Sequence, residues 1–268
     1  MRVRMMRQVC LSIALLLMFL TGPVRAQFFL EEGKVTLTVA GGERSSGSMV
    51  LHNTSDEEVG VRAYWEDFRY VPPFDGNKEF SPAGILPGSA SQWVSFTPQE
   101  FVLPPNGSQV IDYAVNAPAD IKGGHYGVLF FERATPMIDS TGVALVTRLG
   151  CLFFVESKDA PRVADIKDVK AEGNDVLGSF VNQSDLVLIP KTTFYLLDAQ
   201  GLTVHRGEGT NLYVAPGATG NWRIALPAEL APGTYSLVLN VDLGSGSVAV
   251  KEISLTQGAN GLTIENLQ

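Results

Sequence analysis

The sequence predicts an all-β protein made of two tandem β-sandwich domains, and three observations favour this fold class. Short runs rich in β-branched and aromatic residues recur from residue 35 to residue 255, separated by Gly, Pro, Asn and Asp, which is typical of strands joined by tight turns. No window keeps the helical spacing of apolar residues over three turns. A local pattern also occurs twice, once in each half of the chain.

The N-terminus has the features of a secretory leader. Three arginines in the first seven residues precede an apolar run at 11–20, which is too short to span a bilayer. Thr21, Gly22 and Pro23 follow, and then Val24-Arg25-Ala26, which fits a signal peptidase site. We therefore expect residues 1–26 to be a cleaved signal peptide and the mature chain to be periplasmic or extracellular. Cys10 precedes the apolar run, so no lipid anchor is expected.

The first half of the mature chain predicts one sandwich. Strands are expected at 35–39, 48–52, 59–65, 92–96, 108–115, 126–132 and 143–155, and seven short strands over roughly 125 residues suit this architecture. Residues 67–88 are rich in Pro and aromatic residues and are interpreted as a long loop. Such a loop either contacts a partner or folds over the edge of its own sandwich.

The second half predicts another sandwich. Strands are expected at 163–169, 176–181, 191–197, 202–205, 212–214, 221–226, 235–241 and 248–255. A short polar link with a proline, residues 157–161, separates the halves. The expected limits are therefore 27–157 for the first domain, 161–257 for the second and 258–268 for a polar tail.

The repeated pattern supports two related domains. Residues 118–126 contain Pro-Ala-Asp-Ile and later Gly-His-Tyr, and residues 227–235 contain Pro-Ala-Glu-Leu and Gly-Thr-Tyr at a constant offset of 109. In each copy the tyrosine, Tyr126 or Tyr235, enters a strand after a connection containing Pro and Gly. Such a tyrosine can turn its hydroxyl back to the backbone as a tyrosine corner, so both are expected to be structural and the sandwiches to be immunoglobulin-like.

Composition and residue spacing exclude several function classes. Without the four arginines of the leader, 16 basic and 28 acidic residues remain, a net charge of −12, which disfavours nucleic acid as a partner. No later run is long and apolar enough to form a membrane segment. The three histidines are dispersed, and Cys151 is the only cysteine of the mature chain, so no catalytic residues, metal site or cofactor are predicted. Cys151 is either a reactive thiol or, as we favour, a small buried apolar residue.

Two segments of the first domain resemble the periplasmic chaperones that assemble pili with an outer-membrane usher. The segment VSFTPQEFVLPPNGSQV at 94–110 has the rhythm of Pro, apolar pair and second Pro that leads into a strand in that family, and GVALVTRL at 142–149 looks like the last strand of its first domain. The resemblance implies two tandem immunoglobulin-like domains. It also implies that the last strand completes a client subunit that lacks a strand.

The resemblance and the alternation of apolar residues indicate a candidate client-binding strand. Val143, Leu145, Thr147 and Leu149 would share one face of an edge strand; alternatively, they fill the core of their own domain. The family binds its client's terminal carboxylate with an Arg on the first strand and a Lys on the last, but Gly150 stands at the Lys position. Arg148, two residues earlier, would replace that Lys, and Lys34 or Arg44 would replace the Arg.

The leading functional hypothesis is therefore a non-enzymatic pilus-chaperone-like protein that binds another exported protein, a pilin-like or surface subunit, by edge-strand addition. The alternative is a structural or adhesive module of the cell envelope, with residues 67–88 as its contact surface.

Overall fold

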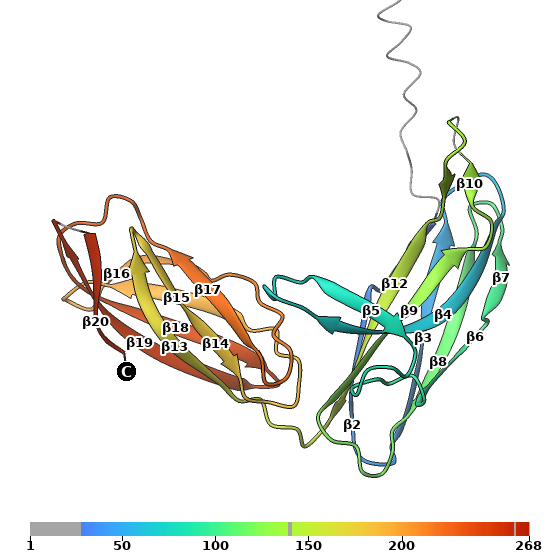
Figure 1. The fold of residues 1–268 in the computed structure, drawn as a ribbon, viewed down its shortest axis with the longest axis horizontal. Helices are drawn as coiled ribbons and strands as arrows, with labels where there is room; N and C mark the ends of the chain where they lie inside the picture. The colour runs from blue at the N-terminus through green and yellow to red at the C-terminus, as the bar shows by residue number, and fades with distance from the viewer. Residues whose placement is uncertain (1–27, 139–140, 260, 268) are drawn as a thin grey trace, which may run out of the picture.

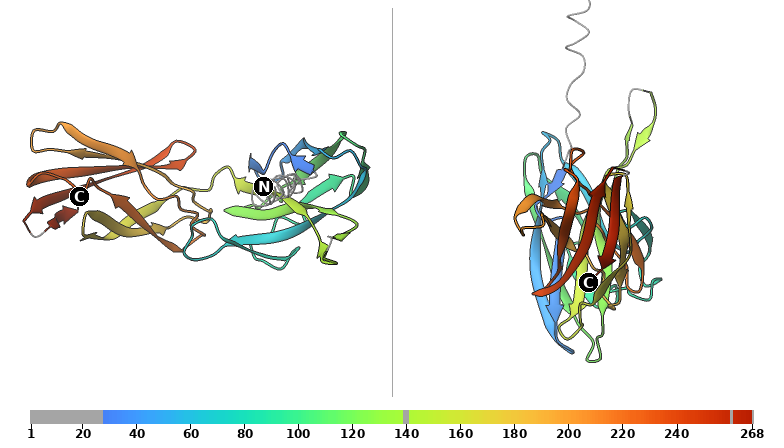
Figure 2. Two further views of the ribbon diagram at one scale, coloured as in Figure 1. Left: turned by 90° about the horizontal axis from the view of Figure 1, so that it is seen from above. Right: turned by 90° about the vertical axis from the view of Figure 1, so that its left-hand side faces the viewer.

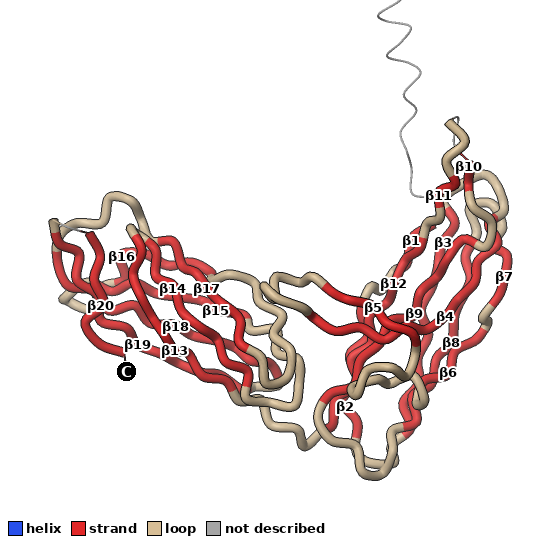
Figure 3. Tube along the Cα trace, viewed as in Figure 1, coloured by secondary structure: helices blue, strands red, loops and turns tan. Residues whose placement is uncertain are grey.

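The chain folds into two β-sandwich lobes joined by a short link. The structure is a computed structural model, and it describes residues 28–138, 141–259 and 261–267; the predicted leader lies outside these ranges. Within them there is no helix, so none that would span a membrane (Figure 3). Figures 1 and 2 show the two lobes side by side, set at an angle to one another.

The first lobe is a sandwich of two main sheets. One sheet has the order β1-β3-β8-β6, the other the order β2-β12-β9-β4-β5 with β7 also paired to β4, and β10 and β11 form a separate hairpin. The strands are β1 (Phe28–Leu30), β2 (Lys34–Val39), β3 (Arg44–Asn53), β4 (Val59–Tyr70), β5 (Lys78–Pro82), β6 (Val94–Thr97), β7 (Glu100–Leu103), β8 (Ser108–Asn116), β9 (Gly124–Arg133), β10 (Met137–Ile138), β11 (Ala144–Leu145) and β12 (Arg148–Ser157).

The second lobe is also a sandwich, with one sheet of order β13-β14-β17 and one of order β16-β15-β18-β19-β20. Its strands are β13 (Ala164–Glu172), β14 (Asp175–Asn182), β15 (Lys191–Leu197), β16 (Thr203–Glu208), β17 (Thr219–Ala225), β18 (Gly233–Gly244), β19 (Ser247–Gly258) and β20 (Gly261–Leu267). No sheet of the described residues combines strands from both lobes.

Side-chain alternation explains how each lobe forms a core. Along β18, Leu237, Leu239 and Val241 are buried while the residues between them face outward, as a half-buried strand requires. In contrast, β9 is buried at every position from Tyr126 to Phe131. One face of β9 packs in the core of the first sandwich, and the other belongs to an apolar cluster shared with the second lobe.

Each lobe contains a buried asparagine that joins two loops to the end of a strand. The amide nitrogen of Asn53, at the end of β3, donates to the carbonyls of Glu57, Leu103 and Pro104 at 2.7, 3.3 and 2.9 Å. The amide nitrogen of Asn182, at the end of β14, donates to the carbonyls of Leu186, Val214 and Ala215 at 2.7, 2.9 and 3.0 Å. Because both bonds satisfy backbone groups with no ladder partner, these residues close equivalent corners of the two sandwiches.

The repeat seen in the sequence has a structural counterpart, since β9 starts at Gly124 and β18 starts at Gly233, 109 residues later. Three expectations need correction. Residues 67–88 are not one loop, because β4 continues to Tyr70 and pairs with β5. Residues 212–214 form only an isolated bridge, through Val214. The polar tail contains β20, which pairs with β19.

Candidate functional site

The strand β12 has one open edge. It pairs antiparallel with β9 from Arg148 to Glu156, but its parallel pairing with β2 begins only at Leu152. The amide of Leu152 donates to the carbonyl of Gly33 at 3.0 Å, so the backbone groups of even-numbered residues point away from β9. The N–H and C=O groups of Arg148 and Gly150 therefore face the side on which β2 is missing, and they can pair with an added strand.

The segment that precedes β12 carries exposed apolar side chains. Val143 and Leu145 are 53% and 47% exposed, and Val146 is 53% exposed. Leu145 belongs to β11, whose short hairpin with β10 projects from the end of the first lobe (Figure 1). The carbonyl of Thr147 accepts a 3.1 Å bond from the amide of Arg133, which fixes the point where the hairpin joins β9 and β12.

The predicted common face of Val143, Leu145, Thr147 and Leu149 is not formed in this structure. The strand expected at 143–155 is interrupted at 146–147, because residues 144–145 pair with β10 whereas residues from 148 onward pair with β9. Leu149 is half-buried and packs on the core of the first sandwich, in line with Cys151 and Phe153. Leu149 thus follows the alternative in which the side chain fills its own domain, whereas Val143 and Leu145 face solvent.

Arg148 has partners within its own sheet. Its Nη1 lies 3.4 Å from the Tyr64 hydroxyl and 3.4 Å from Glu66 Oε1, and its guanidinium lies 4.1 Å from the ring centroid of Phe130. The hydrogen bond with Tyr64 raises the pKa of Arg148, and the charges of Glu66 and Glu132 raise it further. Because carboxylates already face this guanidinium, an added anion would compete with them.

Lys34 and Arg44, the other two basic candidates, lie on different sheets. Lys34 begins β2 beside the junction of the lobes, with its Nζ 4.2 Å from the ring centroid of Phe154. Its pKa is lowered, mainly by burial; Glu156 raises it and Arg162 lowers it. In the described residues Lys34 forms no ion pair, since Glu156 pairs with Arg162. Arg44 begins β3 in the opposite sheet and lies beside Asp112, away from β12.

The hydroxyls of the two predicted structural tyrosines bond differently. Tyr235 donates to the carbonyl of Ala231, four residues upstream, at 2.8 Å, as a tyrosine corner does. Tyr126 needs a correction, because its hydroxyl accepts a 2.6 Å bond from the amide of Val187 in the second lobe. The second lobe lies against this end of β9, so its amide reaches the hydroxyl first. Burial raises the pKa of Tyr126 well above its usual range.

The groups that a reaction would need lie apart. Cys151 is fully buried, and burial raises the pKa of its thiol to about 12, so the thiolate needed for reactivity is disfavoured. His52 pairs with Glu31 at 2.6 Å, His125 lies against Trp93, and His205 lies near Phe194. Among the residues that the structure describes, no group of His, Cys, Asp and Glu is placed to hold a metal ion.

Comparison with known proteins places the fold. No protein-family model matches the chain, and no curated protein matches its sequence. Solved structures do match. One is a chain of the chaperone–tip adhesin complex of CFA/I fimbriae biogenesis, with a TM-score of 0.52 and 12% identity, covering 84% of this chain and 97% of that one. Another is the class 5 fimbriae chaperone CfaA, with a TM-score of 0.51 and 13% identity, covering 83% and 97%.

These matches extend over both lobes of the chain. The predicted fold class, all-β with two tandem immunoglobulin-like sandwiches, is confirmed, and so is the likeness in fold to pilus chaperones. The sequence had indicated that likeness only in residues 94–110 and 142–149. At 12 and 13% identity the likeness concerns the fold, so the function has to be argued from the β12 edge and its surroundings.

Proposed function

We propose that the chain is a non-enzymatic, pilus-chaperone-like protein of the cell envelope that binds another exported protein by strand addition at the edge of β12. The observation that carries the proposal is the open edge at 148–151, directly preceded by a segment with exposed apolar side chains. An unpaired edge is a template for an extended segment, and fold likeness to fimbrial chaperones supports this use of it.

The open edge is short, so the preceding segment has to contribute. Residues 148–151 offer the backbone groups of only two residues to a client. If residues 143–147 leave the β10–β11 hairpin and extend in line with β12, more backbone groups join the edge. Val143 and Leu145 would then insert into the apolar core of a client that lacks a strand. Burying one such side chain is worth about 1.5–3 kcal/mol, which exceeds the contribution of a two-residue hairpin.

We further propose Lys34, rather than Arg148, as the ionic anchor of a client carboxylate. Arg148 already contacts Glu66 and Tyr64, whereas Lys34 is partly desolvated and forms no ion pair in the described residues. A desolvated ammonium gains more from an added carboxylate than a compensated guanidinium does. The proposed mature protein starts at Gln27, and its domains keep the limits 27–157 and 161–257.

Affinity capture of client from envelope extract tests the binding proposal. The mature protein is compared with Leu145→Glu and with Val250→Glu, a control that places the same charge on an exposed valine of β19. We expect Leu145→Glu to abolish capture of a small β-rich exported subunit, identified by mass spectrometry, because the charge cannot enter an apolar core. Capture that survives in Leu145→Glu would contradict strand addition.

The same assay separates the two anchor residues. We expect Lys34→Ala to weaken capture about tenfold or more, as loss of a charge-assisted hydrogen bond does, and Arg148→Ala to weaken it less. The reverse order would assign the anchor to Arg148. The adhesive-module alternative has lost its contact surface, because much of the 67–88 segment packs inside the molecule: Tyr70 and Phe74 are buried in a cluster shared with the second lobe.

A further inference from the structure

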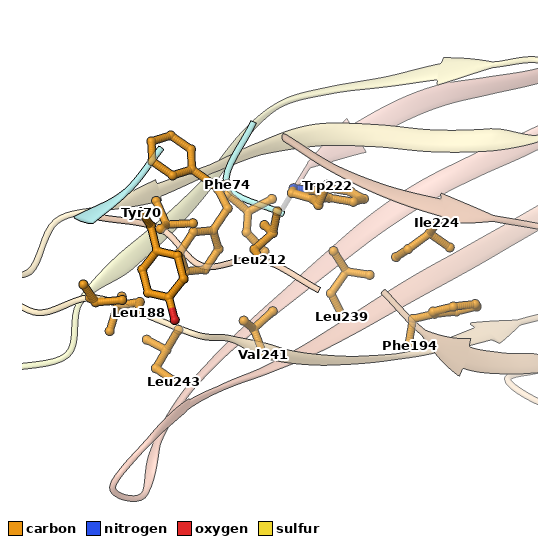
Figure 4. Close-up of a cluster of buried hydrophobic side chains, with 14 of the residues drawn as sticks. Tyr70, Phe74, Leu188, Phe194, Leu212, Trp222, Ile224, Leu239, Val241 and Leu243 are labelled. Atoms are coloured by element: carbon orange, nitrogen blue, oxygen red, sulfur yellow. The ribbon is translucent and has the colours of Figure 1, made fainter. Parts of the chain in front are cut away.

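The β4–β5 hairpin extends from the first lobe to the second. β4 continues beyond β9, the chain turns at 71–77, and β5 returns along it. Figure 1 shows this hairpin reaching across to the second sandwich. In Figure 4 its residues Tyr70 and Phe74 lie beside Leu188 and Leu212 of that sandwich. Both aromatic residues therefore belong to one sheet by covalent connection and to the core of the other lobe by packing.

Phe74, at the tip of the hairpin, is held by the second lobe. Its side chain is 7% exposed, and its carbonyl accepts a 2.8 Å hydrogen bond from the amide of Tyr213. Its φ angle is 65°, in the left-handed region that a bulky residue enters only when surrounding contacts impose it. The contacts that impose this conformation include the backbone bond across the junction, so the tip is shaped for the second lobe.

Tyr70, at the end of β4, forms the second contact of the hairpin. Its ring stacks on that of Tyr213, with centroids 5.0 Å apart and an interplanar angle of 28°. Lys78, across the hairpin, places its Nζ 4.9 Å from the Tyr70 centroid on the first-lobe side. Gly76 lies so near Tyr213 that a Cβ there would be 3.2 Å from the ring. The Tyr213 ring is thus enclosed by three positions of one hairpin.

We propose that residues 70–78 act as a latch that fixes the orientation of the second sandwich relative to the first, with Phe74 and Tyr213 as its deciding contacts. The link at 158–163 contains few residues and cannot itself define an angle between two bodies. The latch does so because rotation of the second lobe would expose Phe74 and Tyr70 and break the Phe74–Tyr213 backbone bond. This inference does not depend on the proposed client.

Distance measurements between the lobes test the latch. Spin labels are attached at Asp112→Cys on β8 and Glu208→Cys on β16, both exposed, while the buried Cys151 stays unlabelled. We expect pulsed electron paramagnetic resonance to give one narrow distance distribution for the labelled protein. Phe74→Ala and Tyr213→Ala should each broaden it or add a second population, with unchanged far-ultraviolet circular dichroism.

The matched control is Phe29→Ala, which also removes an aromatic ring but lies on the exposed face of β1; its distribution should stay narrow. If Phe74→Ala fails to fold, Tyr213→Ala decides, since it leaves the hairpin sequence intact, and Tyr213→Phe should keep the narrow distribution. A distribution that remains narrow in both Phe74→Ala and Tyr213→Ala would overturn the latch.

Discussion

At the scale of single residues, buried polar groups determine the two sandwich corners. Asn53 and Asn182 each donate to three carbonyls, and the side-chain oxygen of each accepts from the amide of the serine two residues later, at 2.9 Å. The chain contains Asn-Thr-Ser-Asp at 53–56 and Asn-Gln-Ser-Asp at 182–185. This signal is present in the sequence, but pattern analysis treats such tetrapeptides as ordinary turns. Only the carbonyls that reach each amide show its role.

Cys151 shows the opposite case, in which the simplest interpretation from sequence agrees with the environment. Its neighbours Leu152, Phe153 and Phe154 indicate a buried strand, and the side chain has no exposed surface. The pKa rise to about 12 is caused mainly by burial, with a smaller contribution from Glu32. A thiol buried this way binds its proton more tightly in the folded than in the unfolded chain.

This shift predicts a pH dependence of stability. Because the folded pKa lies above the unfolded value of 9.0, the stabilisation is complete below pH 9 and is lost as the pH rises toward 12. Between pH 9 and 10, before the tyrosines titrate, we expect Cys151 to add a loss of up to about 1.4 kcal/mol per pH unit. Urea unfolding of the protein and of Cys151→Ala measures this slope. Equal slopes in both would contradict the prediction.

At the scale of elements, strand pairing separates what the sequence predicts from what it leaves open. Most strands lie where alternating or β-branched runs predict them, because such runs fit a half-buried sheet. The exceptions are segments whose partner decides their state. Residues 78–82 read as loop because of Pro82 and exposed polar neighbours, yet they pair with β4. Residues 143–147 read as strand, yet β10 pairs with two of them and diverts the chain from β12.

The open edge of β12 predicts an alternating pattern of amide hydrogen exchange in the protein without client. The amides of Leu149 and Cys151 face β9, and the amide of Leu152 bonds to Gly33, so all three should be protected. The amides of Arg148 and Gly150 face the open side and should exchange about tenfold faster or more. Nuclear magnetic resonance at single-residue resolution measures these rates. Uniform protection across 148–152 would mean that the edge is covered and unavailable to a client.

At the scale of the whole molecule, the number of sandwiches is readable from the sequence but their connection is not. The 109-residue offset and the polar link indicate two related domains. Nothing in the pattern shows that Tyr126 bonds to Val187, or that Phe74 reaches Leu212. These contacts join residues far apart in sequence, and each side looks locally like an ordinary aromatic or aliphatic position. Single-chain patterns report burial and not the identity of the neighbour.

The shared apolar cluster predicts that the two sandwiches unfold together. The cluster extends without interruption from Phe130 and Phe154 of the first lobe through Tyr70 and Phe74 into the second core, so separating the lobes exposes apolar surface on both. Differential scanning calorimetry should give one transition whose van't Hoff and calorimetric enthalpies agree. Phe74→Ala, which removes about 3–5 kcal/mol of packing, should resolve two transitions, whereas Phe29→Ala should keep one. Two transitions in the unmodified protein would mean that the junction contributes too little to couple the lobes.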